Sequence, residues 1–515
     1  MDTSQVPYLK PLAHRGFVRG CTISNSSHAL CHFFGGVRYA LPPAERWRKA
    51  LKLPPSYSYG SRERPGKHDG GAGVCPQPGF LAPPDESQWS EDCFQCNVWV
   101  PVGEPPGGGW PVLVYIHGGW LQFGTPNTFS VAALLGETDF KAVVVMPAYR
   151  LNVFGFLYST ELEQDAASAG ESVGNHGFWD QRLALEWTRE NVHLFGGNPA
   201  NITLAGYSAG AYSVFHQLAY DLRLPHSSSL ITRACIWSNG PGVQPKHPAD
   251  AQTQFTQLLS ALNIPPTLPP AAKLARLRNT PPRTLVDAAS AIRLHEFRPT
   301  TDSAFVSPKL MQALHDGSFA RVLVQRNIRV LLGECRDEHF LYGIWRPPVD
   351  GSRAALRQRL VADYPAAVVD AVLSFYTSPS NNPSGDDQGE EDSSSSLFGH
   401  IYANMQVHHL QRGLIHSLSA HGAGHLLSRY RIEFRLSCVD DFFPAEWGAT
   451  HSTDMAIWFF GNGSRRGLTP SEEAVVKKGV LEPFARFVSG EREFGWAAQG
   501  EREVRVLRAD GAVDV

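Results

Sequence analysis

The chain has 515 residues, of which 43% are hydrophobic and 18% charged, so it can bury a large core and global disorder is excluded. Its 46 Lys and Arg nearly balance 49 Asp and Glu, which leaves a formal net charge of −3. This balance excludes a nucleic-acid-binding protein that depends on phosphate contacts. The sequence also lacks a run of about 18 apolar residues, so a membrane-spanning helix is not expected.

The first residues bear on cellular location, and the cysteines bear on metal binding. Residues 1–20 lack the basic start, apolar run and small-residue cleavage site of a secretory signal, which predicts a cytoplasmic location. The eight cysteines are scattered, and Cys93 and Cys96 form a single CxxC without a second pair to complete a zinc site. We therefore expect neither a metal nor a cofactor.

The pattern of apolar residues predicts an α/β fold. Short β-like runs, such as Phe17–Ile23 and Cys96–Val100, are separated by Gly- and Pro-rich turns. Two continuous apolar runs follow, Pro111–Ile116 and Ala142–Met146, and runs of this kind are typical of strands buried on both faces of a parallel sheet. The clearest helix is expected over Trp179–Asn191. Strands alternating with helices indicate an α/β protein.

Two segments differ from this pattern. Residues 243–325 are rich in Pro and Ala and contain helix-like stretches such as Thr253–Leu262, which predicts a helical insertion or cap. Residues 377–396 are acidic and of low complexity, so we expect a surface loop without chemistry there. We expect residues 1–515 as a whole to form one domain.

A reactive serine is indicated by Gly206-Tyr207-Ser208-Ala209-Gly210, which follows a strand-like stretch and precedes a helix-like one. In this context G-x-S-x-G is a nucleophile elbow, a tight turn that exposes the serine at the edge of the sheet. The N-terminus of the following helix directs free N–H groups at developing negative charge. Ser208 is therefore the predicted nucleophile.

A glycine-rich loop is expected after the strand Pro111–Ile116. His117, Gly118, Gly119 and Trp120 form an HGG-type motif, whose backbone N–H groups bind an oxyanion in esterases. We expect the backbone N–H groups of Gly119, Trp120 and Ala209 to form this oxyanion hole.

These motifs and four further segments resemble one enzyme family. The segments are Phe34–Pro43, Ser90–Val98, Asn175–Leu185 and Phe195–Pro199. The chain resembles the type-B carboxylesterases and lipases, which include the cholinesterases, over roughly residues 17 to 490, and it looks like an intracellular fungal member. The resemblance implies an α/β-hydrolase fold, with helical insertions around an active-site gorge, and a Ser-His-Glu triad.

The resemblance also implies the other two members of the triad. The family acid matches Glu338, with Asp337 and Glu334 as alternatives, although His339 stands where the family has a glycine. The family base matches His451. The chain order serine, acid, histidine is the order of α/β-hydrolases.

Two positions depart from the family. Trp120 replaces a small residue, and its indole either narrows the substrate pocket or packs into the fold. Tyr207 replaces a glutamate before the nucleophile. Ser238, in contrast, matches a family serine that supports the triad from behind.

The resemblance also bears on two cysteines. Those matching Cys75 and Cys93 form a disulfide in secreted relatives, but without a signal peptide we expect reduced thiols here.

The sequence therefore predicts a serine carboxylesterase that acts on a small-molecule ester, with a pocket shaped by residues 243–325. Two alternatives remain open. An enzyme of secondary metabolism with the same triad could transfer the acyl group to an alcohol or close a lactone. A protein of the same fold could also be a catalytically silent binder.

Overall fold

The computed structural model describes residues 3–376 and 394–515. Most of the predicted acidic segment, residues 377–393, lies outside the described residues. Its last three residues belong to helix α14 (Ser394–Ala403). Within the described ranges, no helix is both long and apolar enough to cross a membrane.

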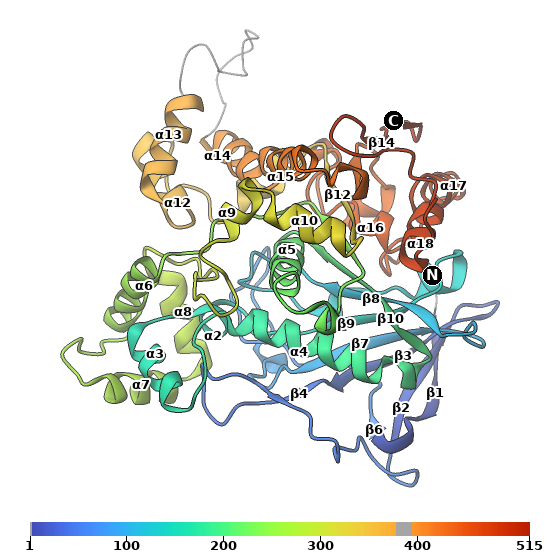
Figure 1. The fold of residues 1–515 in the computed structure, drawn as a ribbon, viewed down its shortest axis with the longest axis horizontal. Helices are drawn as coiled ribbons and strands as arrows, with labels where there is room; N and C mark the ends of the chain where they lie inside the picture. Colours follow the sequence, from blue (N-terminus) through green and yellow to red (C-terminus); the bar gives the residue numbers. More distant parts are fainter. Residues whose placement is uncertain (1–2, 377–393) are drawn as a thin grey trace.

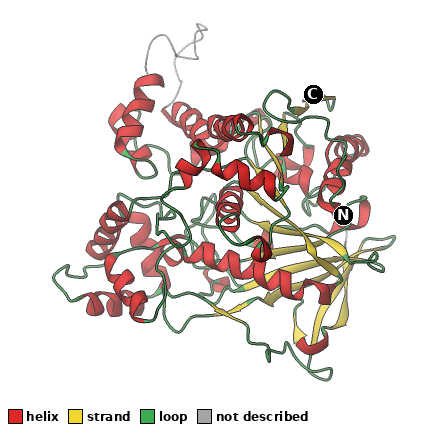
Figure 2. Ribbon diagram, in the orientation of Figure 1, coloured by secondary structure: helices red, strands yellow, loops and turns green. Residues whose placement is uncertain are grey.

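A large mixed sheet runs through the protein, with helices around it (Figures 1 and 2). Its strands follow the order β1-β2-β3-β7-β9-β8-β10-β11-β12-β13-β14-β15, and β6 pairs with β2. Their bounds are β1 Ser4–Pro11, β2 Phe17–Ser24, β3 Ala29–Arg38, β6 Gly66–Lys67, β7 Gln95–Pro101, β8 Trp110–Ile116, β9 Val143–Pro147, β10 Gly197–Tyr207, β11 Arg233–Trp237, β12 Arg329–Cys335, β13 Leu427–Ile432, β14 Arg505–Leu507 and β15 Val513–Asp514. A separate small sheet pairs β4 (Ala40–Leu41) with β5 (Leu51–Lys52).

In the order given, the strands from β9 to β14 pair in parallel. The strands on either side of them pair antiparallel, except that β6 runs parallel to β2. The predicted strands at 17–23, 96–100, 111–116 and 142–146 correspond to β2, β7, β8 and β9. Strand β8 shows why its run of apolar residues does not alternate with polar ones. Val112 and Val114 belong to the core on one face of the sheet, whereas Leu113 and Tyr115 belong to the core on the other.

The helices α4 and α5 pack against strand β10. They cross one face of the sheet in Figure 1. The bounds are α1 Ala132–Glu137, α2 Asn152–Phe156, α3 Thr160–Ser168, α4 His176–Asn191, α5 Ala209–Asp221, α6 Pro248–Ala261, α7 Pro270–Asn279, α8 Pro282–Ala291, α9 Leu310–His315, α10 Ser318–Gln325, α11 His339–Ile344, α12 Arg353–Val361, α13 Ala366–Tyr376, α15 His409–Ala420, α16 Met455–Trp458, α17 Pro470–Val476 and α18 Glu482–Ser489.

Two helices begin earlier than their apolar patterns predict. Helix α4 starts at His176, because Asn175 takes a left-handed conformation (φ 52°) and its carbonyl oxygen already accepts the N–H of Phe178 at 2.9 Å. Helix α6 starts at Pro248, where proline suits the first turn, and the His247 side chain accepts the N–H of Ala249. Local capping therefore adds a first turn that the apolar spacing does not mark.

The segment 243–325 carries the helices α6 to α10 between β11 and β12. Beside it, α11, α12, α13 and α14 form a smaller helical lobe with its own core. Helices α12, α13 and α14 lie at the upper left of Figure 1. That core includes Trp120, so it reaches the glycine-rich loop after β8. The lobe thus packs directly against the predicted catalytic region.

Candidate active site

Ser208 lies at the sharp turn between β10 and α5, as the motif predicts. Its backbone has φ 56° and ψ −124°, which is strained for a residue with a side chain. The turn needs glycine on both sides. A Cβ on Gly206 would lie 2.3 Å from the carbonyl oxygen of Gly210, and one on Gly210 would lie 2.0 Å from that of Ile116. The two glycines therefore let β10, α5 and β8 approach closely enough to hold the strained serine.

His451 and Glu338 meet although they are far apart in the chain. The imidazole Nδ1 lies 2.5 Å from a carboxylate oxygen of Glu338, and the other oxygen accepts the N–H of Cys335 at 2.9 Å. The two side chains are 2% and 0% exposed. In this arrangement Nδ1–H donates to the carboxylate in a short, charge-assisted hydrogen bond. The buried Nε2 has no hydrogen-bond partner in the described chain.

The two alternative acids lie elsewhere. A carboxylate oxygen of Asp337 accepts the N–H of Ala449 at 3.0 Å and pairs with Arg336, so this residue ties the turn after β12 to the loop that carries His451. Glu334 lies 2.9 Å from Nδ1 of His408. The structure therefore brings Glu338, and neither alternative, to the imidazole.

The glycine-rich loop passes close to the nucleophile. A Cβ on Gly118 would lie 3.7 Å from the Ser208 hydroxyl oxygen. Within the described part of the chain, the backbone N–H groups of Gly119, Trp120 and Ala209 donate to no protein acceptor. The residues predicted to bind an oxyanion thus lie around the turn at Ser208.

Trp120 both packs into the fold and borders the site. Its ring stacks on Trp345, with centroids 4.7 Å apart and planes at 13°, and contacts Phe80 and Tyr342. It is 4% exposed, yet it lines the same cavity as Ser208. Each of the two roles left open by the sequence therefore has a structural basis.

Behind the imidazole lies a buried polar cluster. The Tyr207 hydroxyl oxygen accepts the N–H of Ser452 at 2.6 Å, so the residue that replaces the family glutamate supports the histidine loop. Ser238, which is fully buried, contacts the same hydroxyl. Asp454 also reaches Tyr207, and it accepts the indole N–H of Trp458 at 3.1 Å.

The cavity in front of Ser208 and His451 has a volume of about 1020 Å³ and is mainly apolar. Leu81 and Phe442 at its rim are 68% and 71% exposed. Its charged residues are Asp441, which pairs with Arg466 outside the lining, and Arg465. Apart from Leu341, the lining comes from residues 80–81, 115–129, 207–208, 438–443, 451–456 and 461–465. No lining residue comes from 243–325, although the sequence led us to expect that segment to shape the pocket.

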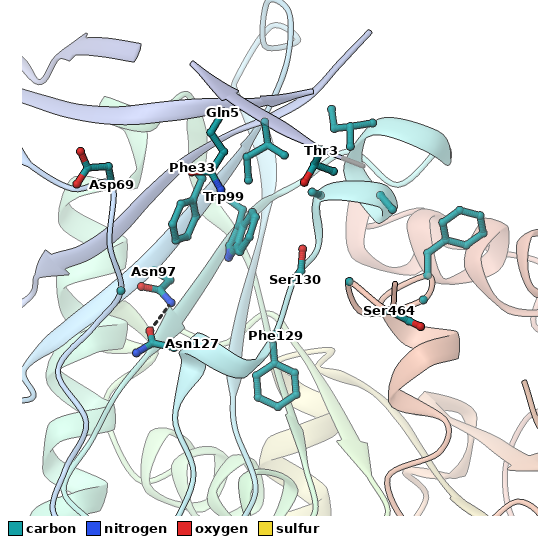
Figure 3. Close-up of a pocket in the computed structure, with 18 of the residues that line it drawn as sticks. Thr3, Gln5, Phe33, Asp69, Asn97, Trp99, Asn127, Phe129, Ser130 and Ser464 are labelled. Carbon is teal, nitrogen blue, oxygen red and sulfur yellow. Dashed lines mark hydrogen bonds between the residues drawn. The ribbon is translucent and has the colours of Figure 1, made fainter. Parts of the chain in front are cut away.

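A second cavity of about 570 Å³ adjoins the first (Figure 3). The two share Phe129 and residues of the turn 461–464. Figure 3 shows Phe33 and Trp99 on its wall, with ring centroids 4.3 Å apart. Neither Ser208 nor His451 lines this cavity, so it is a neighbour of the candidate site and not part of it.

All eight cysteines are buried free thiols. They include Cys75 and Cys93, for which reduced thiols are expected. The neighbouring Cys75 thiol, together with burial, raises the pKa of Cys93. A protonated thiol is a weak nucleophile, so Cys93 is suited to packing and not to catalysis.

Sequence reasoning missed three residues that shape the site: Asp454, Trp345 and Arg298. Asp454 lies three residues after His451, so its position in the H-x-x-D motif was a usable signal. The other two reach the site only through the tertiary fold. Trp345 stacks on Trp120, and Arg298 donates to its carbonyl oxygen.

Asp454 should make stability depend on pH. Burial, and then the charge of Glu338, raises its pKa from 3.8 to about 6. The folded state holds the Asp454 proton more tightly than the unfolded state does. The contribution of this carboxyl to the free energy of unfolding is therefore complete below pH 3.8 and is lost as the pH rises through about 6. Between pH 5 and 8 the loss is about 1.4 kcal/mol.

D454N lacks the titrating carboxyl and should not show this loss. Between pH 5 and pH 8, the difference in free energy of unfolding between D454N and the wild type should therefore shift by about 1.4 kcal/mol in favour of D454N. Urea unfolding of both proteins at the two pH values measures this. A difference between the two proteins that stays constant with pH would contradict it.

Comparison with known proteins identifies the family of the chain. The chain matches the Carboxylesterase family over residues 9–509. It is 46% identical over 520 residues to a carboxylic ester hydrolase of Gibberella moniliformis, covering 99% of this chain and 94% of the relative.

Two further relatives are less similar. An uncharacterized esterase/lipase of Schizosaccharomyces pombe is 36% identical over 97% of this chain and 92% of its own length. The para-nitrobenzyl esterase of Bacillus subtilis is 29% identical over 60% of each chain. The predicted family and fold are confirmed: the chain belongs to the type-B carboxylesterase family and is a carboxylesterase-type hydrolase with the α/β-hydrolase fold.

Proposed function

We propose that the protein hydrolyses a neutral small-molecule ester through an acyl-enzyme, with Ser208, His451 and Glu338 as the catalytic triad. The observation that carries this proposal is the buried 2.5 Å contact between His451 and Glu338, which leaves Nε2 without a partner beside the cavity that Ser208 also lines. An imidazole held in this way is oriented to act as a base.

Acylation follows from these positions. A serine hydroxyl is a weak nucleophile, so Nε2 of His451 takes its proton as Ser208 attacks the ester carbonyl. The hydrogen bond between a nucleophile and its catalytic base is often long before substrate binds and shortens in the reacting complex. Glu338 holds the proton on Nδ1, selects the reactive tautomer and stabilises the imidazolium that forms.

The tetrahedral intermediate needs donors for its oxyanion. The backbone N–H groups of Gly119, Trp120 and Ala209 fill this role, since no protein acceptor in the described chain competes for them. One such donor is worth about 2.7–4 kcal/mol in activation free energy. His451 then protonates the leaving alcohol, and a water activated by the same imidazole releases the acid.

The cavity favours a substrate with a large apolar group. Its two charged residues include Asp441, whose charge is already balanced by Arg466. The exposed Leu81 and Phe442 extend the apolar wall outwards. A neutral ester gains from burial here at about 25 cal/mol per Å² of apolar surface, whereas a charged one loses its hydration.

Two experiments test this function against the alternatives. A fluorophosphonate should label the wild type at Ser208, and a folded protein that stays unlabelled would be a silent binder. Mass spectrometry of the products then identifies the acyl acceptor. A free acid indicates hydrolysis, whereas a new ester or a lactone indicates acyl transfer by the same triad.

S208A should retain the fold and lose about 10⁶-fold in kcat, because the acyl-enzyme cannot form. Ester hydrolysis and a thermal melt of the same preparation measure the two properties. A variant that kept a tenth of the wild-type rate would rule out Ser208 as the nucleophile.

E338Q should lower kcat by about 10⁴-fold, because the imidazole loses its orienting carboxylate. D337N is the matched control. It removes a neighbouring charge that bonds Ala449 and Arg336, so its kcat should fall far less. If D337N had the larger effect, the acid would be assigned to the wrong residue.

W120G should raise kcat/KM for bulky esters relative to short ones by about tenfold, because removal of the indole enlarges the cavity. Glycine also suits the φ of 53° at this position, so the N–H donors remain. Loss of the packed ring should lower the free energy of unfolding by about 3–5 kcal/mol.

W345A is the control for W120G. Trp345 belongs to the same aromatic cluster but does not line the cavity. W345A should therefore lose stability without a change in the ratio of kcat/KM for bulky esters to kcat/KM for short ones. Equal ratios in the two variants would mean that Trp120 is only structural.

A further inference from the structure

The loop that carries the proposed oxyanion donors is strained. Gly119, Trp120 and Leu121 are consecutive and have φ values of 103°, 53° and 64°. A residue with a side chain is strained in this left-handed region, and such conformations persist only where the surroundings impose them. Contacts from outside the loop must therefore hold it.

A charged contact from outside the loop comes from Arg298. Its Nη1 donates to the carbonyl oxygen of Trp120 at 2.7 Å, and the side chain is 3% exposed. The Gln122 amide donates to the same oxygen at 3.2 Å and to the carbonyl oxygen of Phe297 at 2.7 Å. The N–H of Phe297 donates back to Gln122 at 3.3 Å. Hydrogen bonds thus join Trp120 and Gln122 to Phe297 and Arg298 in the protein interior.

Arg298 is itself fixed in place. Its Nε donates to Asp363 of the helical lobe at 2.9 Å, and its Nη2 lies 3.3 Å from the Tyr402 hydroxyl. The other Asp363 oxygen accepts from Tyr402 at 2.7 Å and from Arg359 at 3.1 Å. Burial would raise the pKa of Asp363, but Arg298 and Arg359 hold it below its usual range. The guanidinium is therefore locked by a charged, buried partner.

We propose that Arg298 is a positioning residue that holds the oxyanion loop in its reactive conformation through the Trp120 carbonyl. The inference rests on the proposed function, since it assigns the loop its catalytic role. It also gives the segment 243–325, which lines no part of the cavity, a way to act on the reaction. With the carbonyl bonded to Arg298, the strained loop cannot relax and turn its N–H donors away from Ser208.

The test compares R298M with R359M. Both arginines are buried, at 3% and 4% exposure, and both bond Asp363. The remaining hydrogen bonds of Arg359 go to the carbonyl oxygens of Arg346 and Trp345, and it makes none to the glycine-rich loop. R359M therefore reproduces the disturbance of the charge cluster without loss of the contact to Trp120.

Three quantities are measured on a short neutral ester: kcat, KM and the inhibition constant of a trifluoromethyl ketone, which forms a tetrahedral oxyanion on the serine. R298M should lower kcat by about 10²-fold and weaken the inhibitor by a similar factor, the scale of one lost oxyanion donor. KM should change little. R359M should lose stability but keep kcat and inhibitor binding within a few fold of the wild type.

R298K provides the second variant if R298M does not fold. Its ammonium can still donate to the Trp120 carbonyl, so it should recover part of the lost kcat and inhibitor binding. Equal effects of R298M and R359M, or unchanged kcat in either Arg298 variant, would overturn the proposal. If the wild type itself neither hydrolyses esters nor is labelled at Ser208, the proposed function fails instead.

Discussion

The hydrogen bond between His451 and Glu338 is the interaction around which the site is built. It joins the turn after β12 to a loop 113 residues later in the chain. A carboxylate that is 0% exposed is tolerated only when paired and hydrogen-bonded, which the imidazole and the N–H of Cys335 together provide. The Asp337–Ala449 contact ties the same two segments beside it. The geometry that we propose for catalysis is therefore a consequence of satisfying one buried charge.

Charge is distributed unevenly around this site. Behind the imidazole and beneath the loop lie buried ionisable groups, among them Asp454, Arg298 and Asp363. In front of it the cavity is mainly apolar. In a low-dielectric interior, fixed charges and dipoles act strongly and do not reorganise during the reaction. The protein therefore keeps its polar supports out of the substrate's path, where they hold the reacting groups in place.

The parts of the site with local signatures could be predicted from the sequence. The elbow at Ser208 depends on neighbouring glycines, and strand β8 depends on a continuous apolar run. A few consecutive residues therefore predict each of them. The choice of Glu338 over its neighbours rested on family resemblance, because the partner His451 is remote in the chain. Arg298 left no signal, since its contact with Trp120 exists only after the segment around residue 298 packs on the loop. Nothing in the sequence indicated that residues 243–325 lie away from the cavity lining.

This separation has a consequence for protein engineering. The walls of the cavity come largely from residues 80–81, 115–129 and 438–465, and the glycine-rich loop within 115–129 is bonded by residues 297–298. Loop exchange within 438–465, with His451 and its neighbours retained, would reshape the entrance while leaving the supports of the glycine-rich loop untouched. Redesign of residues 297–298, in the connection between α8 and α9, would do the reverse. If the proposed roles of the cavity and of Arg298 hold, substrate range and turnover can be varied through different parts of one gene.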